Sequence, residues 1–236
     1  MTSSFLNPLC RLFILSLLPL PSKTFTLSMS TSSSSSPPST RFITNKMCPY
    51  AQKAWIALET IKASYNMEEI SLYGANGKPD WFLKLNPEGT VPVLSCYDGM
   101  MVLADSEIIL DFIQDGSVEG EDSLCLYPEE DEVKELVLEW RDIIMRKVAP
   151  IGKNAVLGGK RKELFAALKE IDGKVIGPFL CGEKITVADC AAFPFIWRID
   201  QEFGLDGCDN IKAWLDACMG VDAFKKTVKS AWWWWW

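Results

Sequence analysis

The chain contains no histidine among its 236 residues. This absence excludes the Cys–His and Ser–His pairs of many hydrolases, and it excludes zinc sites of the usual kind. No apolar run is long enough to span a membrane, since the stretch from Leu12 to Leu20 is short and contains Pro19. The eight cysteines lack both metal-ligand spacing and the density of a disulfide scaffold, which favours a reducing compartment. We therefore expect no bound metal ion and no stable membrane association.

Positive charge is also scarce. The chain carries 24 Lys and Arg against 31 Asp and Glu, a net charge of −7 at neutral pH. Nucleic-acid binding needs a basic surface, so this balance argues against a nucleic-acid partner.

No acidic residue precedes Glu59, and the first 40 residues are rich in serine, with a continuous run from Ser32 to Ser36. Ser-rich, basic and acid-free composition is typical of a transit peptide. We expect residues 1–39 to be a disordered targeting segment that directs the protein to the plastid (the chloroplast stroma). A start at Met29, giving a cytosolic protein, and mitochondrial import are the alternatives.

Residues 40–116 show the pattern of a small α/β domain. Strands are predicted at 40–43, 68–72, 90–95 and 100–103, and the Asp98–Gly99 turn predicts that the last two form a hairpin. Helices are predicted at 49–59, 79–85 and 107–114, the last of them capped by Ser106. The order β-α-β-α-β-β-α is the thioredoxin-like arrangement.

The rest of the chain has helical periodicity. An acidic, loop-like linker is predicted at 117–131, followed by an all-helical domain at 132–230 and a Trp-rich tail at 231–236. Helices are predicted at 133–144, 164–175, 187–197, 211–218 and 221–228. Thr186 and Asp189 have the spacing of a capping box at the start of the third of these.

Cys48 is the strongest candidate for chemistry. It lies between the first strand and first helix, and Pro49 suits the first helical turn. A thiol at a helix N-terminus is favoured as thiolate, so we expect a lowered pKa, although an inert capping cysteine fits the same pattern. Position 51 is Ala, not Cys, so an external thiol must resolve any intermediate on Cys48.

Pro92 interrupts an apolar strand, where proline is disfavoured unless the strand lies at an edge. In thioredoxin-like folds this proline is cis and turns the preceding residue, here Val91, toward the cysteine, where its backbone can pair with an extended peptide. Ser106 could hold a carboxylate at a helix N-terminus and Asp105 an ammonium group, although both also suit an ordinary cap. Together these features describe a receptor for glutathione.

These motifs resemble the cysteine-type soluble glutathione transferases, and within them most closely the plant glutathione-dependent dehydroascorbate reductases. The resemblance spans roughly residues 40–229, and several of its motifs are shared with lambda and omega transferases. It is carried by CPYAQK (48–53), KPDWFL (78–83), NPEGTVPV (86–93), ADS (104–106), GPFLCGEKIT (177–186) and FKKT (224–227).

The resemblance implies a glutathione transferase architecture, a nucleophilic Cys48, and a glutathione site that includes Lys78, Val91, Pro92, Asp105 and Ser106. It implies monothiol, ping-pong reduction of dehydroascorbate, with glutathione as co-substrate, no permanently bound cofactor, and a monomer. The alternatives are a lambda- or omega-like thioltransferase, and a non-catalytic or chloride-channel-like membrane-interacting module of the same fold.

Two departures from the reductase pattern concern the substrate side. Met47 stands where an acid usually precedes the cysteine, and Arg198 stands where a histidine is often found. Positive charge for an anionic substrate is expected from Lys46, Lys53 and Arg198, while Trp197 is expected to narrow the cleft.

Overall fold

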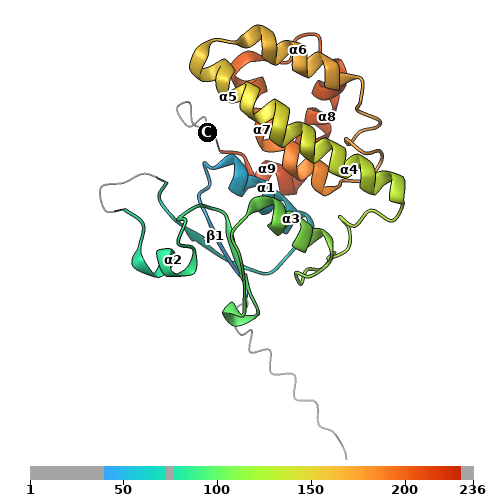
Figure 1. The fold of residues 1–236 in the computed structure, drawn as a ribbon. Helices are drawn as coiled ribbons and strands as arrows, with labels where there is room; N and C mark the ends of the chain where they lie inside the picture. Colours follow the sequence, from blue (N-terminus) through green and yellow to red (C-terminus); the bar gives the residue numbers. More distant parts are fainter. Residues whose placement is uncertain (1–39, 73–76, 230–236) are drawn as a thin grey trace, which may run out of the picture. The chain divides into compact units, whose positions relative to one another are not determined.

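A four-stranded sheet organises the first half of the computed structural model, which describes residues 40–72 and 77–229 (Figure 1). Strands β1 (Arg41–Thr44), β2 (Asn66–Glu69), β3 (Val93–Cys96) and β4 (Met101–Leu103) lie in the order β2-β1-β3-β4. β1 is parallel to β2 and antiparallel to β3, and β4 is antiparallel to β3. The four predicted strands are therefore present. β3 starts after Pro92 instead of including it, because proline has no N–H to donate to the ladder.

Three helices accompany the sheet: α1 (Pro49–Thr60), α2 (Asp80–Leu85) and α3 (Ser106–Gln114). The predicted hairpin is confirmed, with β3 and β4 joined by a short 3-10 turn over Tyr97–Gly99. Asp98 and Gly99 both have positive φ, 55° and 88°, which is the conformation that favours Asp-Gly in such turns. The strand and helix order of a thioredoxin-like domain is thus observed.

The second half is helical. It contains α4 (Asp131–Ile143), α5 (Ala149–Gly158), α6 (Arg161–Asp172), α7 (Val187–Phe203), α8 (Asp209–Met219) and α9 (Asp222–Thr227). The predicted helix at 133–144 does not stop there but runs through a π-helical segment, Ile144–Val148, into α5. Figure 1 shows α7 among these helices, next to α4.

Helix α7 links the two halves, because it packs against α1 as well as α4 and α8. One continuous apolar core holds buried residues from α1, α3, α4 and α7–α9, including Trp55, Phe193, Phe195, Trp214 and Phe224. Within the described residues no helix is long and apolar enough to cross a membrane.

The segment predicted as a linker has no long helix or strand, but it is packed and not extended. Val118 and Leu126 are buried, and the Asp122 N–H donates to Ile61 O at 3.1 Å. Gly120 lies so close to Ile61 that an added Cβ would stand 2.3 Å from its carbonyl oxygen. This segment therefore binds the end of α1 and cannot act as a free hinge.

The predicted capping box at α7 is confirmed. Asp189 is fully buried and accepts hydrogen bonds from the Thr186 N–H (2.8 Å) and hydroxyl (3.0 Å), the Leu180 N–H (2.9 Å) and the Trp214 indole N–H (2.8 Å). A single carboxylate thus joins the start of α7 to the preceding loop and to α8.

Candidate functional site

Cys48 is the residue that precedes the first turn of α1, and Pro49 is the first helical residue, as predicted. Its sulfur lies 3.9 Å from the carbonyl oxygen of Val91. The Val91–Pro92 peptide bond is cis, also as predicted. The two motifs, 43 residues apart in sequence, are therefore brought together at one place, with a half-buried thiol beside a backbone segment that is not part of a strand.

The electrostatics of this thiol differ from the expectation. Burial raises the pKa of Cys48 above that of an ordinary cysteine, while the backbone N–H groups of Ala51 and Tyr50 and the charges of Arg198 and Lys53 act in the opposite direction. The predicted lowered pKa is therefore wrong for the unliganded protein.

A cavity of about 790 Å³ is lined by Val91, whose carbonyl contacts the Cys48 sulfur, although Cys48 itself is not among its lining residues. Its lining includes Val91 and Pro92 from one side, Asp105 and Ser106 from the start of α3, and Tyr50 from α1. Its volume is within the range of small-molecule sites. Four of the five residues expected to hold glutathione thus line one cavity.

The start of α3 differs in detail from the prediction, which gave the cap to Ser106. Asp105 is the N-cap, and its Oδ1 accepts hydrogen bonds from the N–H groups of Glu107 (2.7 Å) and Ile108 (3.1 Å). Ser106 is the first helical residue and is 7% exposed. The aspartate captures the cap because its carboxylate reaches two amide donors at once.

Lys78, the fifth expected residue, is not among the residues that line this cavity. A Cβ added to Gly89 would meet Lys78 Cδ at 3.0 Å and Lys78 Nζ at 3.6 Å. Gly89 itself has φ +66°, so a larger residue there would be strained and would also displace the lysine. Lys78 therefore lies against the loop that carries Glu88 and Thr90 into the cavity wall.

The residues expected on the substrate side are mostly inaccessible. The Lys53 side chain is fully buried against Glu107, Arg198 is 2% exposed, and Trp197 is 7% exposed within the core. Lys46 is accessible but pairs with Glu69 at 3.1 Å. Both Lys53 and Arg198 are therefore held inside the protein, where their positive charges act on Cys48, and their effect on a substrate stays a prediction.

Arg198 instead connects α7 to the residues around Cys48. It donates to Gln52 Oε1 (2.5 Å), to the carbonyl of Pro194 (2.6 Å) and to the carbonyl of Met47 (3.2 Å). Burial lowers the pKa of Arg198 to about 9, so the side chain remains cationic at neutral pH. In this structure Arg198 fixes the segment that carries Cys48, and its positive charge acts to lower the pKa of that thiol.

Three further residues at this site were missed by sequence reasoning. Gln52 accepts from Arg198 and donates to the Thr227 carbonyl (3.3 Å) and hydroxyl (3.1 Å), and Glu107 and Arg141 form an ion pair at 2.8 Å beneath the start of α3. Gln52 lies within the CPYAQK motif and Glu107 directly follows the ADS motif, and this proximity was the available signal. Arg141 gave none.

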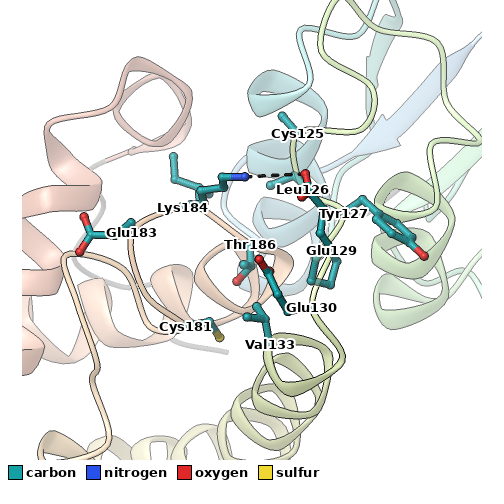
Figure 2. A pocket seen from close by; sticks show the side chains of 12 residues that line it. Cys125, Leu126, Tyr127, Glu129, Glu130, Val133, Cys181, Glu183, Lys184 and Thr186 are labelled. Atoms are coloured by element: carbon teal, nitrogen blue, oxygen red, sulfur yellow. Dashed lines mark ion pairs between the residues drawn. The ribbon is translucent and has the colours of Figure 1, made fainter.

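A second cavity, of about 250 Å³, lies between the end of the linker segment and the loop before α7 (Figure 2). Figure 2 shows Cys125 and Cys181 in its lining and the Lys184–Glu129 ion pair, 3.8 Å long, across it. None of the predicted site residues lines it. Burial raises the pKa of Cys125, and it raises that of Cys181 to about 12, so neither thiol is activated.

Family models match both halves of the chain. Residues 47–115 match the glutathione S-transferase N-terminal domain, and residues 138–217 match the glutathione S-transferase C-terminal domain.

Curated relatives and solved structures agree with these matches. The chain is 28% identical over 194 residues to "Probable glutathione S-transferase DHAR1, cytosolic" from Oryza sativa subsp. japonica, covering 76% of this chain and 83% of the relative. It is 32% identical over 158 residues to "Glutathione S-transferase DHAR2" from Arabidopsis thaliana, covering 66% of this chain and 69% of the relative. The crystal structure of glutathione transferase Omega 3C from Trametes versicolor is similar in fold, with a TM-score of 0.71 at 22% identity, covering 83% of this chain and 91% of that one.

Proposed function

Because this chain belongs to the glutathione S-transferase family, we propose that it is a glutathione-dependent enzyme that reduces dehydroascorbate to ascorbate through Cys48. The observation that carries the proposal is the position of the Cys48 sulfur, at the N-terminus of α1 and 3.9 Å from the Val91 carbonyl, with alanine at position 51. The plant relatives that bear the DHAR name support this substrate class.

The reaction proceeds in three steps with a single enzyme thiol. Dehydroascorbate takes two electrons and two protons and leaves as ascorbate, while water supplies the oxygen that converts the Cys48 thiol to a sulfenic acid. A first glutathione condenses with the sulfenic acid, releasing water and forming a mixed disulfide. A second glutathione attacks that disulfide and releases oxidised glutathione, which restores the thiol.

Glutathione occupies the cavity of about 790 Å³ in this proposal. The Val91 backbone pairs with its cysteinyl residue, which brings the two thiols together. Ser106 and the second oxygen of Asp105 bind the γ-glutamyl end, and Lys78 binds the glycyl carboxylate. Asp105 Oδ1 is already used by the helix cap, so only Oδ2 is available for the ligand ammonium.

A thioltransferase that removes glutathione from disulfides is the second candidate. The burial of Lys53 and Arg198 favours it, because these cations, expected to act on a small anionic substrate, are not among the residues that line the cavity. Trp197, which was expected to narrow the cleft, is packed in the core. This rival uses the same Cys48 chemistry and the same glutathione site.

A coupled assay with both substrates distinguishes the two functions. The catalytic efficiency for dehydroascorbate is expected to exceed that for a glutathionylated disulfide, and conjugation of aromatic electrophiles is expected to be barely detectable. A tenfold or larger preference for the disulfide would replace the reductase function with the thioltransferase function. The Cys48→Ser variant serves as the blank for each substrate.

A further inference from the structure

Arg141 reaches from the helical half of the protein to the first turn of α3. It is 7% exposed, and its guanidinium donates to Glu107 Oε2 (2.8 Å), to Asp111 Oδ1 (2.5 Å) and to the backbone carbonyl of Glu107 (3.1 Å). Such forked contacts fix both the side chain and the main chain of the residue they hold. A residue of α4 therefore determines where Glu107 lies.

The same Glu107 carboxylate also pairs with Lys53 of α1, through its other oxygen. The Lys53 side chain has no exposed surface, and its Nζ lies 3.4 Å from Met145 Sδ and 5.6 Å from the centre of the Tyr50 ring. Lys53, Glu107 and Arg141 form an alternating chain of charges that joins α1, α3 and α4. Each charge is compensated, which is the condition for keeping ions buried.

This chain of charges is connected to the proposed glutathione site through the first turns of α3 and α1. Glu107 follows Asp105 and Ser106, which line the cavity, and Lys53 is on the helix that starts next to Cys48. We propose that Arg141 is a positioning residue for glutathione: it holds the first turn of α3 so that Asp105 and Ser106 present their oxygens to the ligand. The inference rests on the proposed function of this cavity.

The charged groups around Lys53 support the assignment. Burial lowers the pKa of Lys53, and the charge of Arg141 acts in the same direction. Glu107, which faces Lys53 from α3, and Asp105 both oppose that change. For Glu107, burial is overcome by Lys53 and Arg141, and the net effect lowers its pKa. Glu107 is therefore ionised at neutral pH and can hold both cations.

Replacing Arg141 with Gln removes the fork but leaves the Lys53–Glu107 pair. The first turn of α3 then loses its hold from α4, and glutathione loses aligned partners in Asp105 and Ser106. We expect the dissociation constant for glutathione to rise about tenfold to a hundredfold, which corresponds to the loss of about one charge-assisted hydrogen bond. The rate at saturating glutathione should change far less, because Arg141 does not contact the reacting sulfur.

Isothermal titration of the full chain with glutathione tests this inference, with thermal unfolding measured for each variant without ligand. Arg141→Lys should bind between wild type and Arg141→Gln, because it keeps the charge without the fork. If Arg141→Gln does not fold, Asp111→Asn takes its place as the test. This variant removes one contact of Arg141 at a half-exposed site, and it should weaken glutathione binding by a smaller factor. The matched control is Arg146→Gln, since Arg146 lies five residues further along the same helical stretch, is 83% exposed, and pairs with Asp142 at 2.6 Å.

Unchanged glutathione affinity in a folded Arg141→Gln protein would overturn the inference and leave the proposed function intact. Equal weakening by Arg146→Gln would also overturn it, because the effect would then be one of general charge. A wild-type protein that binds no glutathione would overturn the proposed function, and the inference with it.

Discussion

Replacing Arg198 with Met should weaken the fold around Cys48. In the structure Gln52 Oε1 loses a 2.5 Å donor, and the Met47 carbonyl loses a 3.2 Å donor that water can partly replace. The Pro194 carbonyl loses its side-chain donor, but it keeps a main-chain partner within the helix. One buried acceptor left without a donor costs about 1–3 kcal/mol, and a lost bond to a charged group adds a similar amount. The expected loss in the free energy of unfolding is therefore about 2–6 kcal/mol.

The same substitution should raise the pKa of Cys48, because the positive charge of Arg198 lowers it in the wild type. Urea unfolding measures the first effect, with a midpoint shift of about 1–2 M, and the pH dependence of alkylation measures the second. Arg198→Lys separates them, since it keeps the charge and loses the fork. Arg198→Lys should unfold more easily than the wild type, but the pKa of its Cys48 should stay close to the wild-type value.

Activity decides whether Arg198 also contacts a substrate. Since only 2% of the residue is exposed, Arg198→Met should reduce activity toward dehydroascorbate and toward a glutathionylated disulfide by the same factor. If Arg198→Met lost only dehydroascorbate reduction and kept its stability, the structural role of Arg198 would be wrong, and Arg198 would have to contact the substrate.

Four other changes have defined outcomes. Cys48→Ser should abolish activity, and Cys181→Ser should not. In the wild type, alkylation of Cys48 should increase with pH through a midpoint above that of an ordinary thiol, because burial raises the pKa of Cys48. A midpoint below pH 7 would contradict this direction. Ser106→Ala should raise the glutathione Michaelis constant about tenfold to a hundredfold, and no change in both this variant and Asp105→Ala would contradict the proposed site. Asp189→Ala leaves the donors of three residues without an acceptor and should lower the free energy of unfolding by at least about 3 kcal/mol, measured by urea unfolding; a loss under about 1 kcal/mol would be inconsistent with its burial. A reporter fused to residues 1–40 should enter the plastid, whereas a cytosolic or secreted reporter would contradict the targeting prediction.

Much of the fold was predictable because local signals agree with the tertiary structure. The Asp98–Gly99 turn, the Thr186–Asp189 capping box and Pro92 each combine a residue type with a backbone requirement that few other residues meet. Helix α5 had no such signal, since Pro150 and Gly152 interrupt its apolar pattern, although Pro150 lies in the first turn, where it is tolerated.

The candidate site was predictable only where its residues are local in sequence. Cys48 and Val91 were expected together on the basis of a known arrangement, and they lie together. Burial of Lys53 and Arg198 depends on partners far along the chain, Glu107 for one and Gln52 and Met47 for the other, and a linear pattern does not report such pairs. The direction of the Cys48 pKa shift depends on burial for the same reason. The segment predicted to be a targeting sequence (residues 1–39) and the Trp-rich tail (231–236) lie outside the described residues.

In the proposed mechanism the Cys48 thiol passes two electrons to dehydroascorbate before any glutathione reacts. A single-turnover experiment tests it: reduced protein is mixed with dehydroascorbate without glutathione, and ascorbate and the state of Cys48 are both measured. We predict one ascorbate released per chain, with Cys48 trapped as a sulfenic acid by a carbon nucleophile, and neither product in Cys48→Ser. Ascorbate that forms only after glutathione is added, with Cys48 still a thiol, would contradict the account.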